Sequence, residues 1–137
     1  MRAISDRLAS TAQRILEVDS IDFGTCHYYP HFADTKDPIA FGRKWVHQRI
    51  EAGHGAGKPM IVEEYGWPLN PSNGANDAAL RKVAFEAWLT QVQKSRGAGA
   101  LLWMIAATST NGQPYPDYDR YTIYSGEDTG FAPARIF

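Results

Sequence analysis

The apolar residues of this chain change their spacing several times, and each change marks a predicted element of secondary structure. Three segments carry apolar residues at helical spacing with polar side chains between them. Three shorter segments are apolar or aromatic, lack helical spacing and are bounded by proline or glycine, which is typical of buried strands. The predicted elements, in the order helix, strand, helix, strand, helix, strand, are residues 3–17, 21–30, 37–53, 58–64, 76–96 and 100–106.

The ends of the predicted helices carry recognisable cap residues. Asp37 is a predicted N-cap with Pro38 at the first helical position, and that helix is expected to stop near Gly53. Asn76 is predicted to cap the third helix, which closes with basic residues before Gly97. The chain beyond the last strand is rich in Pro, Gly, Asp and Tyr and is predicted to be loop and tail.

Alternating helices and strands with short connections predict right-handed crossovers and a parallel α/β sheet. The last strand, residues 100–106, has no polar alternation, as expected for a strand covered on both faces. Three parallel strands cannot close into a barrel. They either form an open sheet with two exposed edges or belong to a barrel whose other strands lie outside the chain. No shift in composition marks a boundary, so residues 1–137 are expected to form one unit.

Composition narrows the classes of partner. Apolar residues make up 44% and charged residues 21% of the chain, which is typical of a globular fold. A net charge of -1 gives no electrostatic reason to expect nucleic acid or an anionic membrane as a partner. No apolar segment approaches the length of a membrane span, and the single cysteine, Cys26, excludes an intrachain disulfide.

The stretch "KPMIVEEYGW" places Glu63 and Glu64 at the end of the second predicted strand. Consecutive side chains of a strand point to opposite faces, so at most one of these carboxylates is expected to face a site. The carboxyl end of a parallel strand is where α/β barrels and open sheets bind their ligands. The alternative is a strand-end glutamate paired to a neighbouring Arg or Lys.

His27 and Tyr29 stand two residues apart at the end of the first predicted strand, so both are expected on the face that bears one of the glutamates. The alternative for His27 is a core histidine bonded to the backbone. Cys26 points the other way and is expected to be an inert buried thiol. His27 and His31 lack helical geometry, so no metal site is expected.

Aromatic residues supply further candidates for binding a flat ligand. Trp103 lies within the last predicted strand and Trp67 just past the second, and each is either a sugar-stacking platform or a core residue. The stretch "QPYPDYDRY", residues 113–121, is either a binding loop or a solvated proline-rich loop. The residues alone leave these alternatives open.

Three motifs taken together resemble a known family. "FGTCHYYP", "GKPMIVEEYGW" and "GALLWMIA", in this order and spacing, resemble the last three strands of a glycoside hydrolase family 5 barrel, and most closely its endo-β-1,4-mannanases. The resemblance covers roughly residues 18–125. It implies an α/β fold, a partial TIM (β/α)8 barrel of approximately the last three β/α units.

The resemblance implies roles for individual residues. Glu64 matches the catalytic nucleophile, and Glu63 is expected to face the barrel wall as support. His27 and Tyr29 match substrate-contacting residues, and Trp103 matches the sugar platform, with Trp67 a further candidate for substrate binding. The implied activity is retaining hydrolysis of β-mannan, a β-linked polysaccharide, with neither metal nor cofactor. Relatives are mostly secreted, which implies an extracellular location.

The second carboxylic acid of such enzymes has no match in this chain. It lies roughly 5 Å from the nucleophile and, in the family, within an Asn-Glu-Pro motif that this sequence lacks. A complete barrel takes about 250 residues. The chain is therefore expected to be the C-terminal portion of a glycosidase catalytic domain, inactive alone and prone to self-association or to pairing with a missing N-terminal half. The alternatives are a β-1,4-glucanase (cellulase) of the same family and a non-catalytic glycan-binding remnant.

The segment "PDYDRYTIY" also resembles the family's segment after the final strand. Asp-Gly-Tyr is more usual there, and Arg120 replaces the glycine in this chain.

Overall fold

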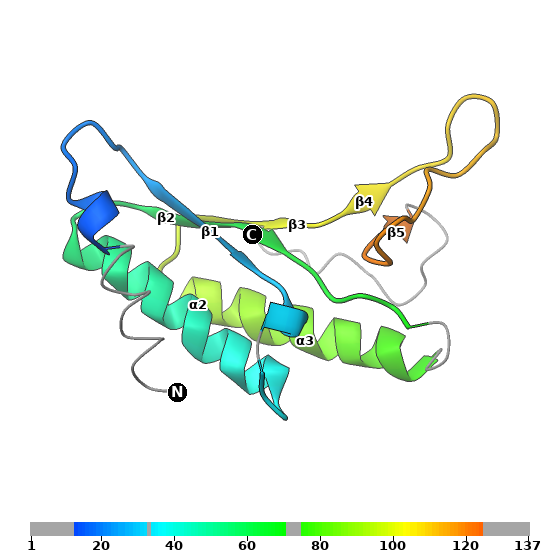
Figure 1. Cartoon of the computed structure of the whole chain (residues 1–137), viewed down its shortest axis with the longest axis horizontal. Helices are drawn as coiled ribbons and strands as arrows, with labels where there is room; N and C mark the ends of the chain where they lie inside the picture. The colour runs from blue at the N-terminus through cyan, green and yellow to red at the C-terminus, as the bar shows by residue number, and fades with distance from the viewer. Residues whose placement is uncertain (1–12, 33, 71–74, 125–137) are drawn as a thin grey trace.

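The computed structural model describes residues 13–32, 34–70 and 75–124 (Figure 1). The elements, in chain order, are β1 (Gly24–Tyr28), η1 (Pro30–Phe32), α2 (Pro38–Gly55), β2 (Met60–Tyr65), α3 (Ala75–Lys94), β3 (Gly99–Leu102), β4 (Ile105–Ala106) and β5 (Ile123–Tyr124). The first three strands form one sheet in the order β1-β2-β3, and both pairings are parallel. The predicted parallel sheet is confirmed.

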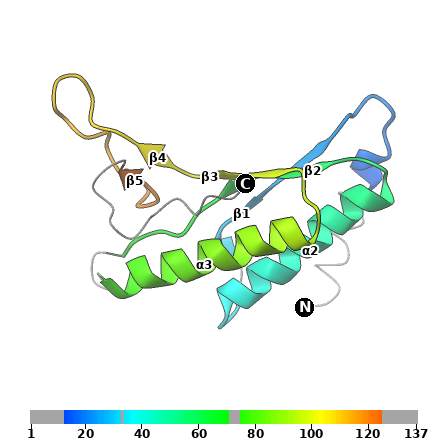
Figure 2. The same cartoon turned by 180° about the vertical axis from the view of Figure 1, so that it is seen from behind.

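Both long helices lie on the same face of this sheet. Figure 1 and Figure 2 show α2 and α3 side by side beneath the strands. Helices of a doubly wound sheet cover both faces, whereas those of a (β/α)8 barrel all lie outside the strands. The arrangement is therefore that of a sector of a barrel wall. Among the described residues, no helix covers the opposite face, which would be the inside of such a barrel.

The boundaries of the helices differ from the predicted ones in three places. Of the first predicted helix, residues 3–12 lie outside the described residues, and residues 13–16 are helical. Helix α2 continues past Gly53 to Gly55. Gly53 is a packing residue and not a stop signal, because an added Cβ would lie 2.8 Å from the Lys58 carbonyl oxygen. Helix α3 begins at Ala75, so Asn76 lies within its first turn and the predicted cap is wrong.

The strand predictions also need correction. Strand β1 begins at Gly24, three residues after the predicted start. The segment 100–106 is not one strand covered on both faces: β3 and β4 are separated by Trp103 and Met104, and β4 leaves the sheet to pair with β5. Leu101 is 56% exposed, because the helices cover only one face of the sheet. The chain after residue 106 is not all loop, since β5 follows.

The core fills the space between the sheet and the two helices. Trp88 of α3 lies at its centre, with its ring 4.9 Å from the ring of Tyr28 and its Nε1 donating to the Ile39 carbonyl at 3.1 Å. Gly42 lets α2 approach closely, because an added Cβ would clash with the Tyr28 and Trp88 rings. The buried core residues are Leu16, Tyr28, Val46, Ile50, Met60, Val62, Tyr65, Ala84, Phe85, Trp88, Val92 and Ile123.

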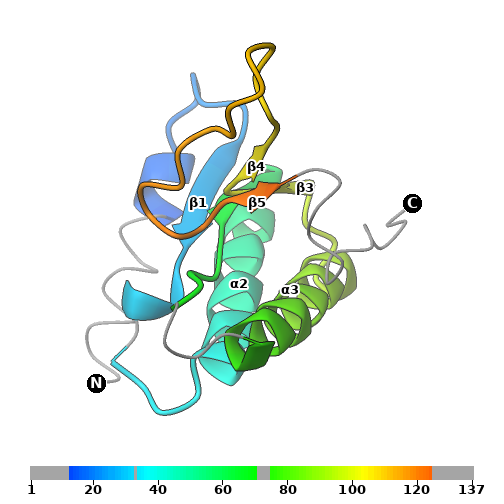
Figure 3. The same ribbon diagram turned by 90° about the vertical axis from the view of Figure 1, so that its right-hand side faces the viewer.

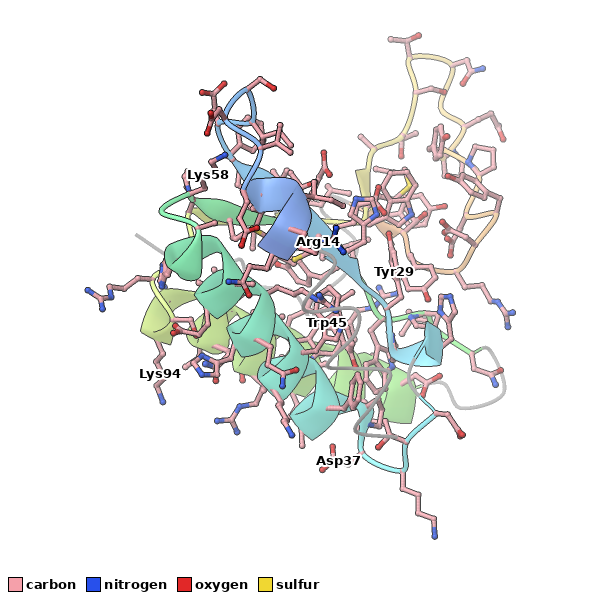
Figure 4. The ribbon with its side chains drawn as sticks, turned by 60° about the vertical axis from the view of Figure 1, so that its left-hand side comes forward. Arg14, Tyr29, Asp37, Trp45, Lys58 and Lys94 are labelled. Atoms are coloured by element: carbon pink, nitrogen blue, oxygen red, sulfur yellow. The ribbon has the colours of Figure 1, made fainter. Side chains whose placement is uncertain are left out.

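The predicted cap of α2 is confirmed. Asp37 precedes Pro38 at the start of the helix, and its carboxylate accepts a hydrogen bond from the Ala40 amide at 2.9 Å. This contact satisfies one of the backbone N–H groups that a helix leaves unpaired at its beginning. Figure 4 labels Asp37 at this end of the helix.

The segment after β4, residues 107–124, lies at the carboxyl ends of the strands (Figure 3, yellow to orange). The buried Arg81 of α3 holds it there, with Nη2 donating to the Arg120 carbonyl at 3.1 Å and Nη1 to the Thr122 carbonyl at 3.3 Å. Arg81 Nε donates to the Trp67 carbonyl at 3.0 Å, so one guanidinium joins α3, the loop after β2 and the C-terminal segment.

Arg120 occupies a strained backbone position within this segment. Its φ of 68° lies in the left-handed region, where glycine is favoured because it has no Cβ. This geometry explains why glycine is more usual at the corresponding position of the family that the sequence resembles. The Arg120 carbonyl accepts from the Leu69 amide at 2.8 Å, and this bond fixes the turn against the loop after β2.

A substitution at Gly66 tests how strongly the stability of the chain depends on close packing of the C-terminal segment. An alanine Cβ at this position would lie 2.6 Å from Tyr121 Cδ1 and 2.7 Å from the Trp103 carbonyl oxygen. We expect Gly66→Ala to lower the free energy of unfolding by about 1–3 kcal/mol, because a backbone atom in a packed layer cannot move aside. Urea unfolding followed by circular dichroism measures the loss.

Gly99→Ala is the matched control in the same sheet, because its Cβ would meet only Ile61 Cγ2 at 4.0 Å. We expect this variant to unfold at nearly the wild-type urea concentration. Equal losses for the two variants would contradict the packing of Tyr121 over Gly66.

Candidate active site

Strand β2 contains one residue more than its neighbours at the point where the two glutamates lie. Val62 and Tyr65 pair with Cys26 and Tyr28 of β1, so three steps along β2 match two steps along β1. The pairing with β3 shifts over the same residues of β2. This is a β-bulge, in which two residues of one strand oppose a single residue of the partner strand. Glu63 and Glu64 are the two residues, and His27 is the residue opposite.

The bulge overturns the prediction that only one carboxylate faces the site. Glu63 Oε2 lies 3.1 Å from His27 Nε2, and Glu64 Oε2 lies 3.3 Å from Nδ1 of the same ring. Glu63 therefore does not face the barrel wall. Strict alternation holds only for regular strands, and the extra residue brings both carboxylates to the open face of the sheet.

Glu64 is held by two side chains of the preceding strand and its extension. The Tyr29 hydroxyl donates to Glu64 Oε2 at 2.6 Å, and His27 Nδ1 approaches the same oxygen. The predicted gathering of His27, Tyr29 and Glu64 at the carboxyl ends of the strands is confirmed. Both contacts are made to Oε2, so neither occupies the second carboxylate oxygen, Oε1. A carboxylate held in this way presents one oxygen to a ligand in a fixed orientation.

Tyr29 is itself packed among aromatic residues of the C-terminal segment and of η1. Its ring lies 5.0 Å from that of Tyr121 and 5.8 Å from that of His31, and His31 Nδ1 lies 2.7 Å from the Tyr121 hydroxyl oxygen. In Figure 4 Tyr29 lies toward this segment, whereas Trp45 lies between β1 and α2. Burial, followed by the hydrogen bond to Glu64, raises the pKa of Tyr29 above its usual value. The phenol therefore remains a hydrogen-bond donor at neutral pH.

Glu63 has the opposite electrostatic character to a general acid. A hydrogen bond from Thr25, followed by the one from His27, lowers the pKa of Glu63. A carboxylic acid that protonates a leaving group near neutral pH needs a raised pKa. Glu63 is consequently a stable anion and a poor candidate for the acid that the sequence lacks.

Trp103 and Trp67 lie in different surroundings. The Trp103 indole follows β3 and donates from Nε1 to Asp119 Oδ2 at 2.8 Å, so it is half-buried and oriented by the C-terminal segment. The Trp67 ring lies 6.1 Å from the core residue Trp88. The structure therefore leaves Trp103 available as a platform and favours the core alternative for Trp67.

Cys26 lies on the helix side of the sheet, packed against the core, as its position next to His27 predicts. Burial raises the pKa of its thiol to about 12, which keeps it in the unreactive protonated form. Across the described ranges 13–32, 34–70 and 75–124, no three His, Cys, Asp or Glu side chains gather as a metal site would require. In these same ranges, no helix is long and apolar enough to cross a membrane.

Three residues of this region were not singled out by the sequence for these roles: Asp119, Tyr121 and His31. Asp119 orients Trp103 and also accepts from the Tyr121 amide at 3.1 Å. The ring of His31, two residues after Tyr29, and the ring of Tyr121, far along the chain, both pack against Tyr29. The aromatic and acidic stretch 113–121 was the available signal, but its fold back onto β1 is a long-range contact that spacing cannot reveal.

Comparisons with known proteins find mannanases in sequence and in structure, although no family model matches. The chain is 38% identical over 114 residues to a probable mannan endo-1,4-β-mannosidase of Aspergillus terreus, covering 82% of this chain and 25% of that protein. It is 33% identical to mannan endo-1,4-β-mannosidase A of Hypocrea jecorina, covering 80% of this chain and 22% of that protein. The chain thus spans about a quarter of these relatives' length.

Solved structures give the same result. An endo-β-1,4-mannanase from Thermotoga petrophila superposes with a TM-score of 0.70 at 30% identity, covering 84% of this chain and 25% of that one. A glycoside hydrolase family 5 mannosidase from Rhizomucor miehei has a TM-score of 0.67 at 15% identity, covering 89% of this chain and 38% of that one, a likeness of fold alone. The predicted fold class, a partial (β/α)8 barrel, is confirmed.

The tyrosines of the site and core predict an alkaline limit to stability. Burial raises the pKa of Tyr65 and of Tyr121 to about 12, whereas an unfolded tyrosine titrates near pH 10. The folded chain therefore holds these protons more tightly, and its stability is complete below pH 10 and lost as pH rises from about 10 to about 12. Urea midpoints measured from about pH 8 to about pH 11 should fall at the alkaline end.

Tyr65→Phe should remove part of this fall, because phenylalanine keeps the buried ring without an ionisable hydroxyl. A midpoint that stays constant through the alkaline range would contradict the burial of these phenols.

Proposed function

Because the chain is mannanase-like, with the sequence and fold of part of a glycoside hydrolase family 5 barrel, we propose that it carries the nucleophile side of a retaining endo-β-1,4-mannanase. Glu64 is the nucleophile in this proposal, and His27, Tyr29 and Trp103 bind the sugar. One observation supports it most directly: the Tyr29 hydroxyl and His27 Nδ1 converge on the same oxygen of Glu64.

The chemistry follows from this geometry. Oε1 of Glu64 forms a bond to the anomeric carbon while the bond from that carbon to the leaving oxygen breaks, and water later hydrolyses the glycosyl ester. The Tyr29 hydroxyl and His27 Nδ1, both at Oε2, hold the carboxylate in place and stabilise its negative charge. Protonation of the leaving oxygen and activation of water need a second carboxylic acid roughly 5 Å away. This 137-residue sequence has no Asn-Glu-Pro to supply it, so we propose that the chain alone does not turn over substrate.

The choice of polysaccharide rests on the names of relatives, which include mannan endo-1,4-β-mannosidases and an endo-β-1,4-mannanase. A β-1,4-glucanase remains the nearest alternative. Mannose and glucose differ in configuration at C2, and the arrangement around the nucleophile does not by itself distinguish the two sugars. A non-catalytic glycan-binding remnant is the alternative of another class, with Trp103 as its platform. The extracellular location implied by the resemblance belongs to the same proposal.

Covalent labelling tests the nucleophile without requiring the missing acid. A fluorinated mannoside with an activated leaving group needs no protonation of that group, so Glu64 should become slowly labelled, and peptide mass spectrometry should locate the adduct. Glu64→Gln should abolish labelling because an amide is a far weaker nucleophile. Glu63→Gln is the neighbouring control and should retain labelling, although at a lower rate. Adding the missing N-terminal half in trans should restore turnover of mannan.

The reverse result, with Glu63→Gln unlabelled and Glu64→Gln labelled, would assign the nucleophile to the other carboxylate. A corresponding fluorinated glucoside, tested in parallel, separates the two alternatives. Faster labelling by the mannoside supports a mannanase, and faster labelling by the glucoside supports a glucanase.

The open sheet predicts the solution behaviour of the chain. Within the described residues, the outer edges of β1 and β3 have no strand partner, and Leu101 is exposed on the sheet. Open edges and exposed apolar surface favour association. We expect oligomers in sedimentation velocity, or binding of a hydrophobic dye in a fluorescence assay. Leu101→Lys should reduce both. A monodisperse monomer that binds no dye and unfolds cooperatively would argue against an isolated barrel sector.

A further inference from the structure

Glu63 makes more side-chain contacts than a solvent-exposed glutamate at the end of a strand would need. Its side chain is 47% exposed, yet it lies within hydrogen-bond distance of His27 Nε2 at 3.1 Å and accepts a hydrogen bond from Thr25. Both partners belong to β1, and both contacts stabilise the ionised form of the carboxylate. Glu63 thus ties the two strands together through charge on the open face of the sheet.

The imidazole between the two glutamates is contacted on both ring nitrogens. Nε2 faces Glu63 and Nδ1 faces Glu64, at 3.1 and 3.3 Å. An ionised carboxylate only accepts hydrogen bonds, so the neutral ring can donate to one of the two glutamates, and only the imidazolium, with a proton on each nitrogen, can donate to both. An acceptor at Nε2 also fixes the rotation of the ring, since a flipped ring would present carbon atoms to the carboxylates. The position of Nδ1 against Glu64 therefore depends on what holds Nε2.

We propose that Glu63 is a positioning residue that acts on Glu64 through the His27 imidazole. By contacting Nε2, Glu63 fixes the rotation of the ring and so holds Nδ1 at 3.3 Å from Oε2 of Glu64. The β-bulge makes this possible, because it places both carboxylates opposite a single histidine. The catalytic consequence rests on the proposed role of Glu64 as nucleophile, but the contact itself can be measured without any reaction.

Nitrogen-15 NMR of the histidine rings tests the contact in the full chain. The chain has four histidines, and Glu63→Ala should shift both ring nitrogens of His27 while the signals of His47 and His54 stay in place. Glu63→Gln should shift His27 less, because the amide oxygen still accepts from Nε2. Unchanged signals at His47 and His54 also report that the variants are folded.

Glu51→Gln is the matched control, a glutamate on α2 within 4.0 Å of His47 Nδ1 and 3.5 Å of His54 Nδ1. We expect it to move those two rings and leave His27 unchanged. His27 nitrogens that do not respond to Glu63→Ala would overturn the proposal, whether or not Glu64 reacts with any sugar.

A double-mutant cycle tests whether Glu63 acts through His27 or directly. With the fluorinated mannoside, Glu63→Ala should slow labelling of Glu64 by roughly threefold to tenfold, the range for one charge-assisted hydrogen bond. His27→Ala should slow it by at least as much, and adding Glu63→Ala to His27→Ala should cause no further loss.

Additive losses would show that Glu63 acts on the reacting atoms directly and would overturn the positioning role. If the wild-type chain is not labelled at all, the proposed function of Glu64 fails, and the NMR result alone decides the link between Glu63 and His27. The two failures are therefore distinguishable.

Discussion

The extra residue in β2 is the constraint on which the site depends. Val62 and Tyr65 both pack into the core between sheet and helices, although they are three positions apart and a regular strand would place them on opposite faces. The bulge allows both Val62 and Tyr65 to be buried on the same face, and it leaves Glu63 and Glu64 together on the open face. Core packing on one side of the sheet thus enforces the pairing of carboxylates on the other.

The carboxyl ends of the strands become a site only when the C-terminal segment lies over them. Arg81 reaches from α3 to two carbonyls of that segment, and Gly66 leaves the space that the Tyr121 ring occupies. Tyr121 in turn packs against Tyr29, which holds Glu64. A chain of direct contacts therefore links the buried guanidinium to the candidate nucleophile, and loosening the segment would loosen the carboxylate.

The two glutamates differ in what surrounds them. Glu63 is exposed and bonded to Thr25 and His27, which keeps it ionised, whereas Glu64 is more enclosed and receives the Tyr29 phenol. The lowered pKa of Glu63 is the opposite of what a general acid requires. The arrangement suits a nucleophile and its support, which agrees with a chain spanning about a quarter of the mannanases that it matches.

Apart from the choice of Glu64, which came from the family resemblance, the sequence by itself determined the alternation of helices and strands, the parallel sheet, the Asp37 cap and the meeting of His27 and Tyr29 with one of the two glutamates. These follow from local periodicity and from the rule that parallel strands end at one edge. Only the tertiary structure decided the bulge, the break after β3 and the return of Tyr121 onto Tyr29. Each depends on contacts between residues far apart in the chain, where packing against a particular neighbour overrides the local pattern.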